Sequence, residues 1–325
     1  MQLPKGKTNC ITDVEGVKVG HVTLYEKINE QKTVCTGVTA ILPHDSNLFY
    51  KKIRAASSVI NGYGKTAGLV QVDELGLLES PIMLTNTFSV GAVWQGTLQY
   101  MLDTNPEIGN TTSSLNVVVG ECNDSYLNSV RLQSVKPEHA IQAIKNASDK
   151  PVEEGAVGAG KGTVCFEYKG GIGTASREVE EYTIGCLVLS NFGKREDALF
   201  ADFEKIKMET PDGSIMMIIA TDAPLYDRQL KRLAKRCTAG LGRTGSIIGH
   251  GSGDIAIAFS TAETYEHQAE SPVESVMFLR DDQPVMNKLF QAVVETTEEA
   301  VINSLRNAET TEGRKGRVVE KAPLE

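Results

Sequence analysis

The feature of this sequence that most constrains the fold is a series of short, continuous apolar runs. Each is long enough for a β-strand, and most lack the alternation of apolar and polar residues expected when one face of a sheet meets water. Strands of this kind are covered on both faces. The pattern therefore predicts an α/β protein with stacked layers of sheets and helices rather than an open β-sandwich. The runs lie at 38–42, 82–84, 117–119, 184–189, 215–220 and 255–259.

Helical patterns lie between and after these runs. The clearest is expected from Asp222, a candidate N-cap, through Pro224 in the first turn to Gly240, which we expect to end the helix. Its basic residues fall opposite its apolar stripe and indicate a solvated face. A second long helix is expected over 285–307, and the polar segment 309–325 is expected to fray.

Composition and charge exclude several classes of protein. The chain has 325 residues, 41% of them hydrophobic, which suffices for a large core in one domain covering 1–325. A net charge of −9, without a long basic tract, argues against a nucleic-acid partner. The N-terminus lacks the apolar run of a signal peptide, and no segment approaches the roughly twenty apolar residues of a membrane span. We therefore expect a cytoplasmic protein without a membrane partner.

The cysteines and histidines show no metal-site spacing. Six cysteines and five histidines are scattered along the chain, without a C-x-x-C pair or an H-E-x-x-H motif. Several cysteines lie within apolar runs, where cysteine is expected as a small core residue. We therefore expect any chemistry to proceed without a metal or another cofactor.

Two glycine-rich stretches resemble nucleotide-binding motifs without completing them. Gly155 and Gly160 followed by Lys161 have the spacing of a phosphate loop, but the next residue is Gly162, which lacks the hydroxyl that would hold magnesium. In the stretch 171–176, a serine replaces the third glycine of the dinucleotide fingerprint. Both stretches are interpreted as tight backbone turns.

The stretch 210–224 has the clearest chemical meaning. A Pro-Asp-Gly turn at 211–213 directly precedes Ser214, which opens an apolar strand. If the Gly213–Ser214 bond is broken, a hydroxyl and a free α-amine belong to one residue, and the amine, with a pKa of about 8, can act as the base for the hydroxyl. Gly213 has no side chain to obstruct the strained turn of an N-to-O acyl shift. Asp-Gly-Ser is also a common turn, so the local pattern by itself is compatible with an ordinary turn that has no catalytic role. Neither a G-x-S-x-G elbow nor a credible S-x-x-K motif supports another serine mechanism.

Further site candidates follow other apolar runs or precede one. Ser252 and Asp254 stand before the run 255–259 and could bring a hydroxyl and a carboxylate to one point, or simply satisfy their own loop. Glu121 and Asn191 come just after strands, where sites in layered folds gather. Each of these two is also compatible with a purely structural role.

Taken together, these stretches resemble the DmpA-type aminopeptidases, the family of the L-aminopeptidase/D-amidase-esterase and the β-peptidyl aminopeptidases. Some of these relatives carry glutamate where this chain has Asp254. The matching stretches extend over nearly the whole chain, at 11–23, 37–44, 61–65, 84–87, 120–124, 168–177, 191–193, 213–214, 220–225 and 252–254.

The resemblance implies a fold and a maturation step. The fold is a four-layer αββα sandwich, like that of the N-terminal nucleophile hydrolases but with different connectivity. Self-cleavage between Gly213 and Ser214 would give an α chain, 1–213, and a β chain, 214–325, which stay together, commonly in a homotetramer. The expected substrate is a small peptide, amide or ester with a free amine.

The resemblance also implies roles for the candidate residues. Ser214 would attack the substrate carbonyl, while Ser252 and Asp254 would steer its proton. Asn191 would help bind the oxyanion, and Glu121 would hold the free ammonium of the substrate. Two alternatives stay open at this point. One is an acyltransferase of the ornithine acetyltransferase type, and the other is a binding protein that remains uncut.

Overall fold

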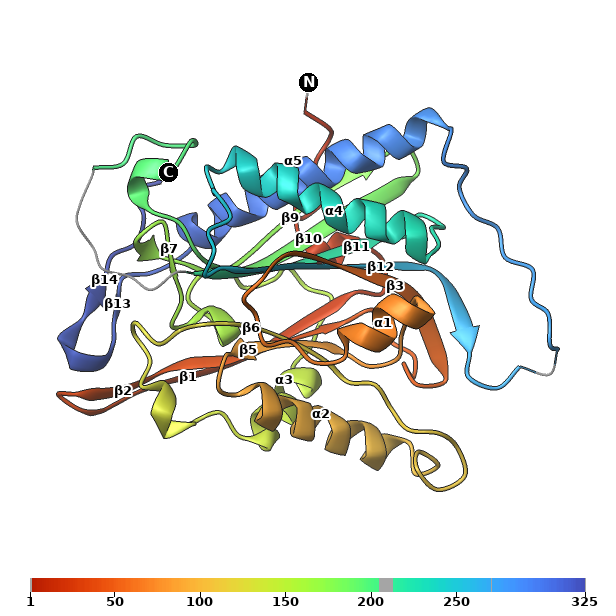
Figure 1. Cartoon of the computed structure of the whole chain (residues 1–325), viewed down its shortest axis with the longest axis horizontal. Helices are drawn as coiled ribbons and strands as arrows, with labels where there is room; N and C mark the ends of the chain where they lie inside the picture. Colours follow the sequence, from red (N-terminus) through yellow and green to blue (C-terminus); the bar gives the residue numbers. More distant parts are fainter. Residues whose placement is uncertain (1, 205–212, 270, 325) are drawn as a thin grey trace.

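Two sheets lie face to face between two layers of helices in the computed structural model, which describes residues 2–204, 213–269 and 271–324 (Figure 1). Helices α4 (Asp227–Arg243) and α5 (Pro284–Arg306) cover the outer face of one sheet. Helices α2 (Val90–Thr104) and α3 (Pro137–Lys145) cover the outer face of the other. The short helix α1 (Leu69–Leu75) packs beside the first sheet. The four-layer αββα sandwich that the family resemblance implied is therefore confirmed.

The two sheets differ in size. The smaller has the order β1-β2-β5-β6, and the larger has the order β4-β3-β12-β11-β10-β9. Two short hairpins, β7-β8 and β13-β14, complete the strands of the described residues. The strands of the smaller sheet are β1 (Lys18–Asn29), β2 (Lys32–Leu42), β5 (Ile82–Asn86) and β6 (Val118–Cys122). Those of the larger sheet are β3 (Lys51–Gly62), β4 (Leu77–Leu78), β9 (Gly171–Val179), β10 (Tyr182–Asn191), β11 (Ser214–Thr221) and β12 (Gly253–Glu266). The hairpins are formed by β7 (Val164–Cys165) with β8 (Tyr168–Lys169), and β13 (Thr311–Glu312) with β14 (Val318–Val319).

The central strand β11 shows why the apolar runs are continuous. Met216 and Ile218 face the smaller sheet and belong to the core between the two sheets. Ile215 and Met217, on the other face of the strand, pack into the core beneath α4 and α5. All six predicted apolar runs form or overlap strands, and their residues are covered on both faces, as expected for a layered protein.

The boundaries predicted for the first long helix are wrong at both ends. The helix begins at Asp227 rather than at Asp222, whose Oδ1 instead accepts a hydrogen bond of 2.7 Å from the backbone N–H of Thr183. Pro224 consequently precedes the helix. Gly240 does not end the helix either, since α4 continues to Arg243. The glycine instead allows close packing against α5, where a Cβ would lie 2.6 Å from the carbonyl oxygen of Val294. The second predicted helix, α5, agrees with its prediction to within one residue at each end.

The expectation that 309–325 frays is also wrong for the residues that the structure describes. Strands β13 and β14 pair in this segment, and Val319 and Ala322 are each only 1% exposed. The carbonyl oxygen of Glu320 accepts a hydrogen bond of 2.7 Å from the N–H of Lys169. A few apolar side chains in a polar segment are thus enough to fix it on the protein surface.

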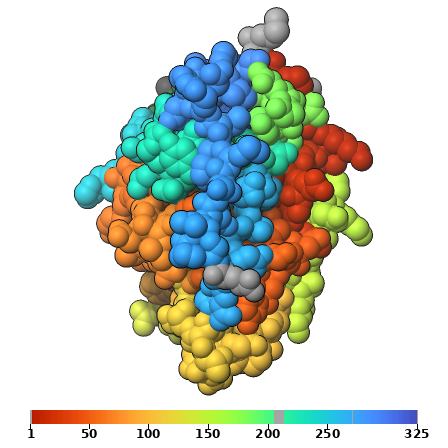
Figure 2. Space-filling model, turned by 90° about the vertical axis from the view of Figure 1, so that its right-hand side faces the viewer, coloured from red at the N-terminus to blue at the C-terminus, as the bar shows by residue number. Residues whose placement is uncertain are grey.

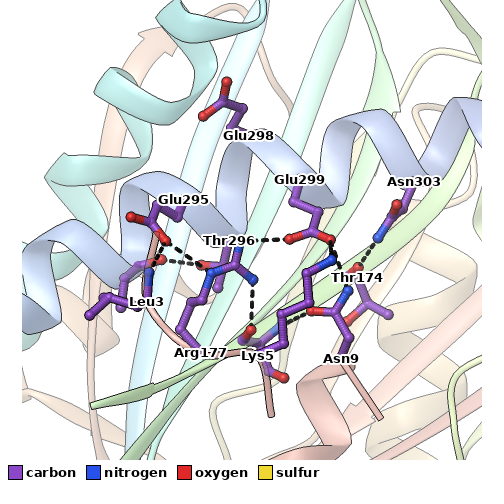
Figure 3. A network of polar contacts seen from close by, with 12 residues as sticks. Leu3, Lys5, Asn9, Thr174, Arg177, Glu295, Thr296, Glu298, Glu299 and Asn303 are labelled. Carbon is purple, nitrogen blue, oxygen red and sulfur yellow. Dashed lines mark hydrogen bonds and ion pairs between the residues drawn. The ribbon is translucent and has the colours of Figure 1, made fainter. Parts of the chain in front are cut away.

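A buried ion-pair network joins α5 to β9 and to the start of the chain (Figure 3). The guanidinium of Arg177 lies between Glu295 and Glu299, with contacts of 3.0 and 2.6 Å. The N–H of Leu3 donates to Glu295, and Lys5 pairs with Glu299. The network connects segments on both sides of the Gly213–Ser214 bond.

The linker between β12 and α5 lies across one face of the molecule (Figure 2). It is attached near α4, where the N–H of Leu279 bonds to the carbonyl oxygen of Pro224 at 2.9 Å. No helix in the described part of the chain has the length and apolar character needed to cross a membrane. All six cysteines are buried with free thiols, as expected for core residues.

Candidate active site

Ser214 is the first residue of β11, at the edge of the space between the two sheets. Its side chain is held there because the backbone N–H of Gly253 donates a hydrogen bond of 3.1 Å to Ser214 Oγ. The parallel pairing of β11 with β12 sets this contact by placing Ser214 beside Gly253. The strand start predicted at Ser214 is confirmed, whereas of the predicted turn at 211–213 only Gly213 lies within the described residues.

Asn191, the last residue of β10, lies directly opposite Ser214 in the antiparallel ladder. Opposite residues in such a ladder place their side chains on the same face, with Cβ atoms about 5 Å apart. The side-chain Oδ1 of Asn191 accepts a hydrogen bond of 2.9 Å from the N–H of Val164. This contact fixes the orientation of the amide and leaves its N–H₂ group as the part that can donate to a negatively charged oxygen beside Ser214.

Glu121, on β6 of the smaller sheet, lies near Ser214 because two glycines between them, Gly64 and Gly253, are in close contact. A Cβ on Gly253 would lie 2.8 Å from the Cα of Gly64 and 3.1 Å from Ser214 Oγ. A Cβ on Gly64 would in turn lie 3.7 Å from Glu121 Oε1. The two glycines therefore allow the carboxylate of Glu121 and the hydroxyl of Ser214 to line one short stretch of backbone.

The carboxylate of Glu121 is buried without a compensating cation in the part of the chain that the structure describes. Oε1 accepts a hydrogen bond of 2.9 Å from the backbone N–H of Lys65, and Oε2 accepts one from the hydroxyl of Thr87. The ammonium of Lys65 turns away and donates to the carbonyl oxygen of Tyr63 at 2.9 Å. An unpaired buried carboxylate is costly, and a cationic ligand group would compensate its charge.

Ser252 and Asp254 form a hydrogen-bonded pair at the start of β12. Ser252 Oγ donates to Asp254 Oδ1 at 2.7 Å, while Oδ2 is buried and has no partner among the described residues. Burial raises the pKa of Asp254 to about 6, against the opposite effect of the hydrogen bond from Ser252. No hydrogen bond between side chains joins this pair to Ser214 within the described residues.

Ser252 nevertheless lies close to the bond that is expected to break, because the next residue, Gly253, pairs with Ser214. Gly213 and Ser252 line the same cavity of about 100 Å³, together with Phe192 and Ile248. Around Gly213 there is no room for a side chain, because a Cβ there would lie 2.5 Å from the Cα of Phe192. The structure thus brings Gly213, Ser214, Asn191 and Ser252 together, and it places Asp254 beside Ser252.

Several residues that shape the site had no assigned role in the sequence analysis. Asn61 donates its side-chain amide to the carbonyl oxygens of Gly249 and His250, both at 3.1 Å, and so holds the loop before Ser252. Gly64 and Lys65 lie in the same stretch, 61–65, and its match to the family was the only feature of the sequence that pointed to these residues. Their contacts depend on strand pairing and could not be deduced from the local pattern.

The glycine-rich stretch 155–163 forms tight turns, as interpreted from the sequence. Gly155 and Gly158 have φ values of 80° and 51°, in the left-handed region that favours glycine. The same interpretation is wrong for 171–176, which lies in strand β9 and pairs with β10. Lys161 pairs with Glu309 at 2.8 Å. Within the described ranges, no group of three or more His, Cys, Asp or Glu side chains is arranged to hold a metal ion.

Comparison with known proteins places this chain in a family. The model of peptidase family S58 matches residues 9–319. The β-peptidyl aminopeptidase BapA of Sphingosinicella microcystinivorans is 40% identical over an alignment of 348 residues, covering 98% of this chain and 86% of that protein.

Solved structures agree in fold along the chain. A protein from Pyrococcus horikoshii OT3 is 50% identical, with a TM-score of 0.92 over 99% of this chain and 93% of the other. The L-aminopeptidase D-Ala-esterase/amidase of Ochrobactrum anthropi, a variant of the Ntn hydrolase fold, is 34% identical, with a TM-score of 0.91 over 99% and 93% of the two chains. The acyltransferase and the uncut binding protein are not favoured by these relatives. The chain belongs to peptidase family S58 and is an aminopeptidase of the N-terminal-nucleophile type.

Proposed function

We propose that the chain cuts itself between Gly213 and Ser214 and that the freed Ser214 then removes N-terminal residues from small peptides, amides or esters. The observation that carries this proposal is the position of Ser214 at the start of a buried strand, with its hydroxyl beside Gly253 and opposite Asn191. A new α-amine on Ser214 would lie next to the hydroxyl that it must deprotonate. The products are an α chain, 1–213, and a β chain, 214–325.

The catalytic cycle uses the side chains gathered around Ser214. Its hydroxyl attacks the substrate carbonyl, and the N–H₂ group of Asn191 donates to the oxygen as it becomes negative. The Ser252–Asp254 pair, hydrogen-bonded at 2.7 Å, helps to move the proton to the leaving amine. An acyl-enzyme forms on Ser214 Oγ, and water releases it.

Glu121 limits the reaction to the end of a peptide. Its buried carboxylate, which has no cationic partner among the described residues, would bind the free ammonium of the substrate by charge-assisted hydrogen bonds. Glu121 adjoins Gly64, and Gly64 adjoins Gly253 beside Ser214. This neighbourhood suits an aminopeptidase, whose substrate carries the free ammonium and the scissile carbonyl on the same residue.

The substrates to screen are small amides with a free N-terminal amine. The Sphingosinicella microcystinivorans relative is named a β-peptidyl aminopeptidase, and the Ochrobactrum anthropi relative an L-aminopeptidase and D-Ala-esterase/amidase. A panel of L-aminoacyl, D-alanyl and β-aminoacyl amides therefore covers the activities that these names describe. A homo-oligomeric assembly and a cytoplasmic location stay predictions.

The test is the intact mass of purified wild-type protein and of Ser214→Ala. We expect two chains of roughly 23 and 12 kDa from the wild type, in proportion to their lengths, and a single full-length chain from the variant. A wild type that remains whole and inactive would contradict the proposal. Cleavage before Ser252 instead would transfer the role of nucleophile to Ser252.

A further inference from the structure

Lys169 is a buried lysine that the proposed mechanism does not use. Its side chain is fully buried, and its ammonium donates to three backbone carbonyl oxygens rather than to a carboxylate. The acceptors are Gly160 at 2.8 Å, Thr163 at 2.9 Å and Gly170 at 2.7 Å. Three acceptors match the three N–H groups of a protonated lysine. The contacts therefore favour the charged form at a place where water does not reach it.

One of these contacts connects Lys169 to the proposed oxyanion donor. The carbonyl of Thr163 and the N–H of Val164 belong to the same peptide group. The Lys169 ammonium donates to the carbonyl oxygen of this peptide group. The N–H of the same group, which belongs to Val164, donates to Asn191 Oδ1 at 2.9 Å. The ammonium is thus joined to the side-chain amide of Asn191 by two successive hydrogen bonds through one peptide.

The hairpin β7-β8 holds both ends of this connection in register. Val164 and Lys169 are paired directly across it. Its two turn residues, Phe166 and Glu167, have φ values of 50° and 58°, in the left-handed region that residues other than glycine seldom adopt. The N–H of Phe166 bonds to the carbonyl oxygen of Phe192 at 2.6 Å, one residue beyond Asn191. The surrounding contacts therefore maintain a strained turn beside the site.

We propose that Lys169 is a positioning residue that polarises the Thr163–Val164 peptide and, through it, the amide of Asn191, so that the Asn191 N–H₂ group stabilises the oxyanion more strongly. Hydrogen bonds in series strengthen one another, because each donor group becomes more positive as its acceptor end accepts a bond. This inference rests on the oxyanion role of Asn191 in the proposed function.

The surroundings of Lys169 affect its charge in opposite directions. Burial lowers the pKa of its ammonium to about 7, and the nearby ammonium of Lys161 acts the same way, whereas Cys35, Asp124 and Cys165 raise the pKa. The three carbonyl contacts also stabilise the protonated form. The ammonium of Lys161 is itself paired with Glu309, and within the described residues it forms no hydrogen bond with the Thr163–Val164 peptide.

The first experiment is a double-mutant cycle of Lys169→Met and Asn191→Ala, measured as kcat and KM on fully processed enzyme. We expect Lys169→Met to lower kcat about 10-fold with KM nearly unchanged, because only the transition state carries the oxyanion. In the Asn191→Ala background the same substitution should change kcat by less than about 2-fold. Lys161→Met, which removes a neighbouring cation outside the connection, serves as the matched control and should keep the wild-type kcat.

Each result separates this inference from the proposed function. If Asn191→Ala leaves kcat unchanged, the oxyanion role of Asn191 is wrong, and the inference fails with it. If Asn191→Ala lowers kcat but Lys169→Met lowers it equally in both backgrounds, only the inference is overturned. An equal loss of kcat in Lys161→Met would indicate a general effect of charge and would likewise overturn the connection through the peptide.

A second variant decides the question if Lys169→Met does not fold or mature. Replacing Val164 by its α-hydroxy analogue turns the Thr163–Val164 amide into an ester, which removes the N–H that binds Asn191 and keeps both side chains and the ammonium. We expect a loss in kcat of about 10-fold or more without a matching rise in KM. A wild-type kcat in this ester variant overturns the inference.

Discussion

Asn191 and Ser214 face each other across the β10-β11 ladder, and their side chains share the face that looks toward the smaller sheet. The two residues are 23 positions apart in the sequence, and only the pairing of the strands brings amide and hydroxyl together. From this relationship we expect Asn191→Ala to lower kcat by about 100- to 1,000-fold with little change in KM. Steady-state kinetics on processed enzyme tests this, and a loss confined to KM would contradict an oxyanion role.

Gly213→Ala should slow self-cleavage. The added Cβ would meet the Cα of Phe192 at 2.5 Å and come still closer to the carbonyl oxygen of Asn191, so the scissile peptide must shift relative to Ser214. A displacement of about 1 Å at a reacting bond can cost about 100-fold in rate. The measurement is the fraction of cut chain against time. Gly242→Ala on α4, where a Cβ meets nothing within 4 Å, is the matched control and should mature at the wild-type rate.

Glu121→Gln should weaken the use of substrates with a free ammonium. The amide keeps the size of the side chain but loses its charge, so kcat/KM is expected to fall by about 10- to 100-fold, mostly through KM. The control is the same substrate with an acetylated N-terminus, which we expect to be a poor substrate for both wild type and variant. Equal values of kcat/KM for the free-amine substrate in the two enzymes would exclude Glu121 as the ammonium site.

Asp254 should make the uncut protein less stable as the pH rises. Its pKa is raised on folding from 3.8 to about 6, so the buried charge costs stability above pH 6, and this cost disappears as the pH falls to the unfolded value. The shift corresponds to about 3 kcal/mol in the free energy of unfolding. In a Ser214→Ala background, Asp254→Asn should therefore gain stability relative to its parent between pH 4 and pH 8. Denaturant unfolding at both pH values measures this, and a difference independent of pH would contradict it.

Arg177→Met should strongly destabilise the fold, because it leaves the carboxylates of Glu295 and Glu299 without their shared cation (Figure 3). Breaking a buried ion pair on one side costs about 3–5 kcal/mol. The control is Arg243→Met on α4, which removes a more exposed pair with Glu298, another glutamate of α5, at 3.2 Å and should cost less than about 1 kcal/mol. Urea unfolding of both variants in the uncut Ser214→Ala background compares them. Similar losses in the two variants would show that burial of Arg177 adds nothing.

The sequence by itself determined the layered class of the fold, the six strands β2, β5, β6, β10, β11 and β12, and the position of Ser214 at the start of one of them. These are local properties, since a continuous apolar run between turn residues specifies a doubly covered strand wherever it pairs. The resemblance on quoted stretches also identified the family, which the comparisons confirm.

Only the tertiary structure decided which side chains meet. The local sequence predicts that Gly240 ends a helix, yet Gly240 lies inside α4. A glycine is needed there because α5 packs too closely to leave room for a side chain. The approach of Glu121 to Ser214 depends on contact between Gly64 and Gly253, and the connection from Lys169 to Asn191 depends on a hairpin beside β10. These contacts join residues far apart in the chain, and their free energy comes from packing and hydrogen bonds that exist only once the sheets have assembled. Local sequence therefore specified the elements, while long-range pairing built the site.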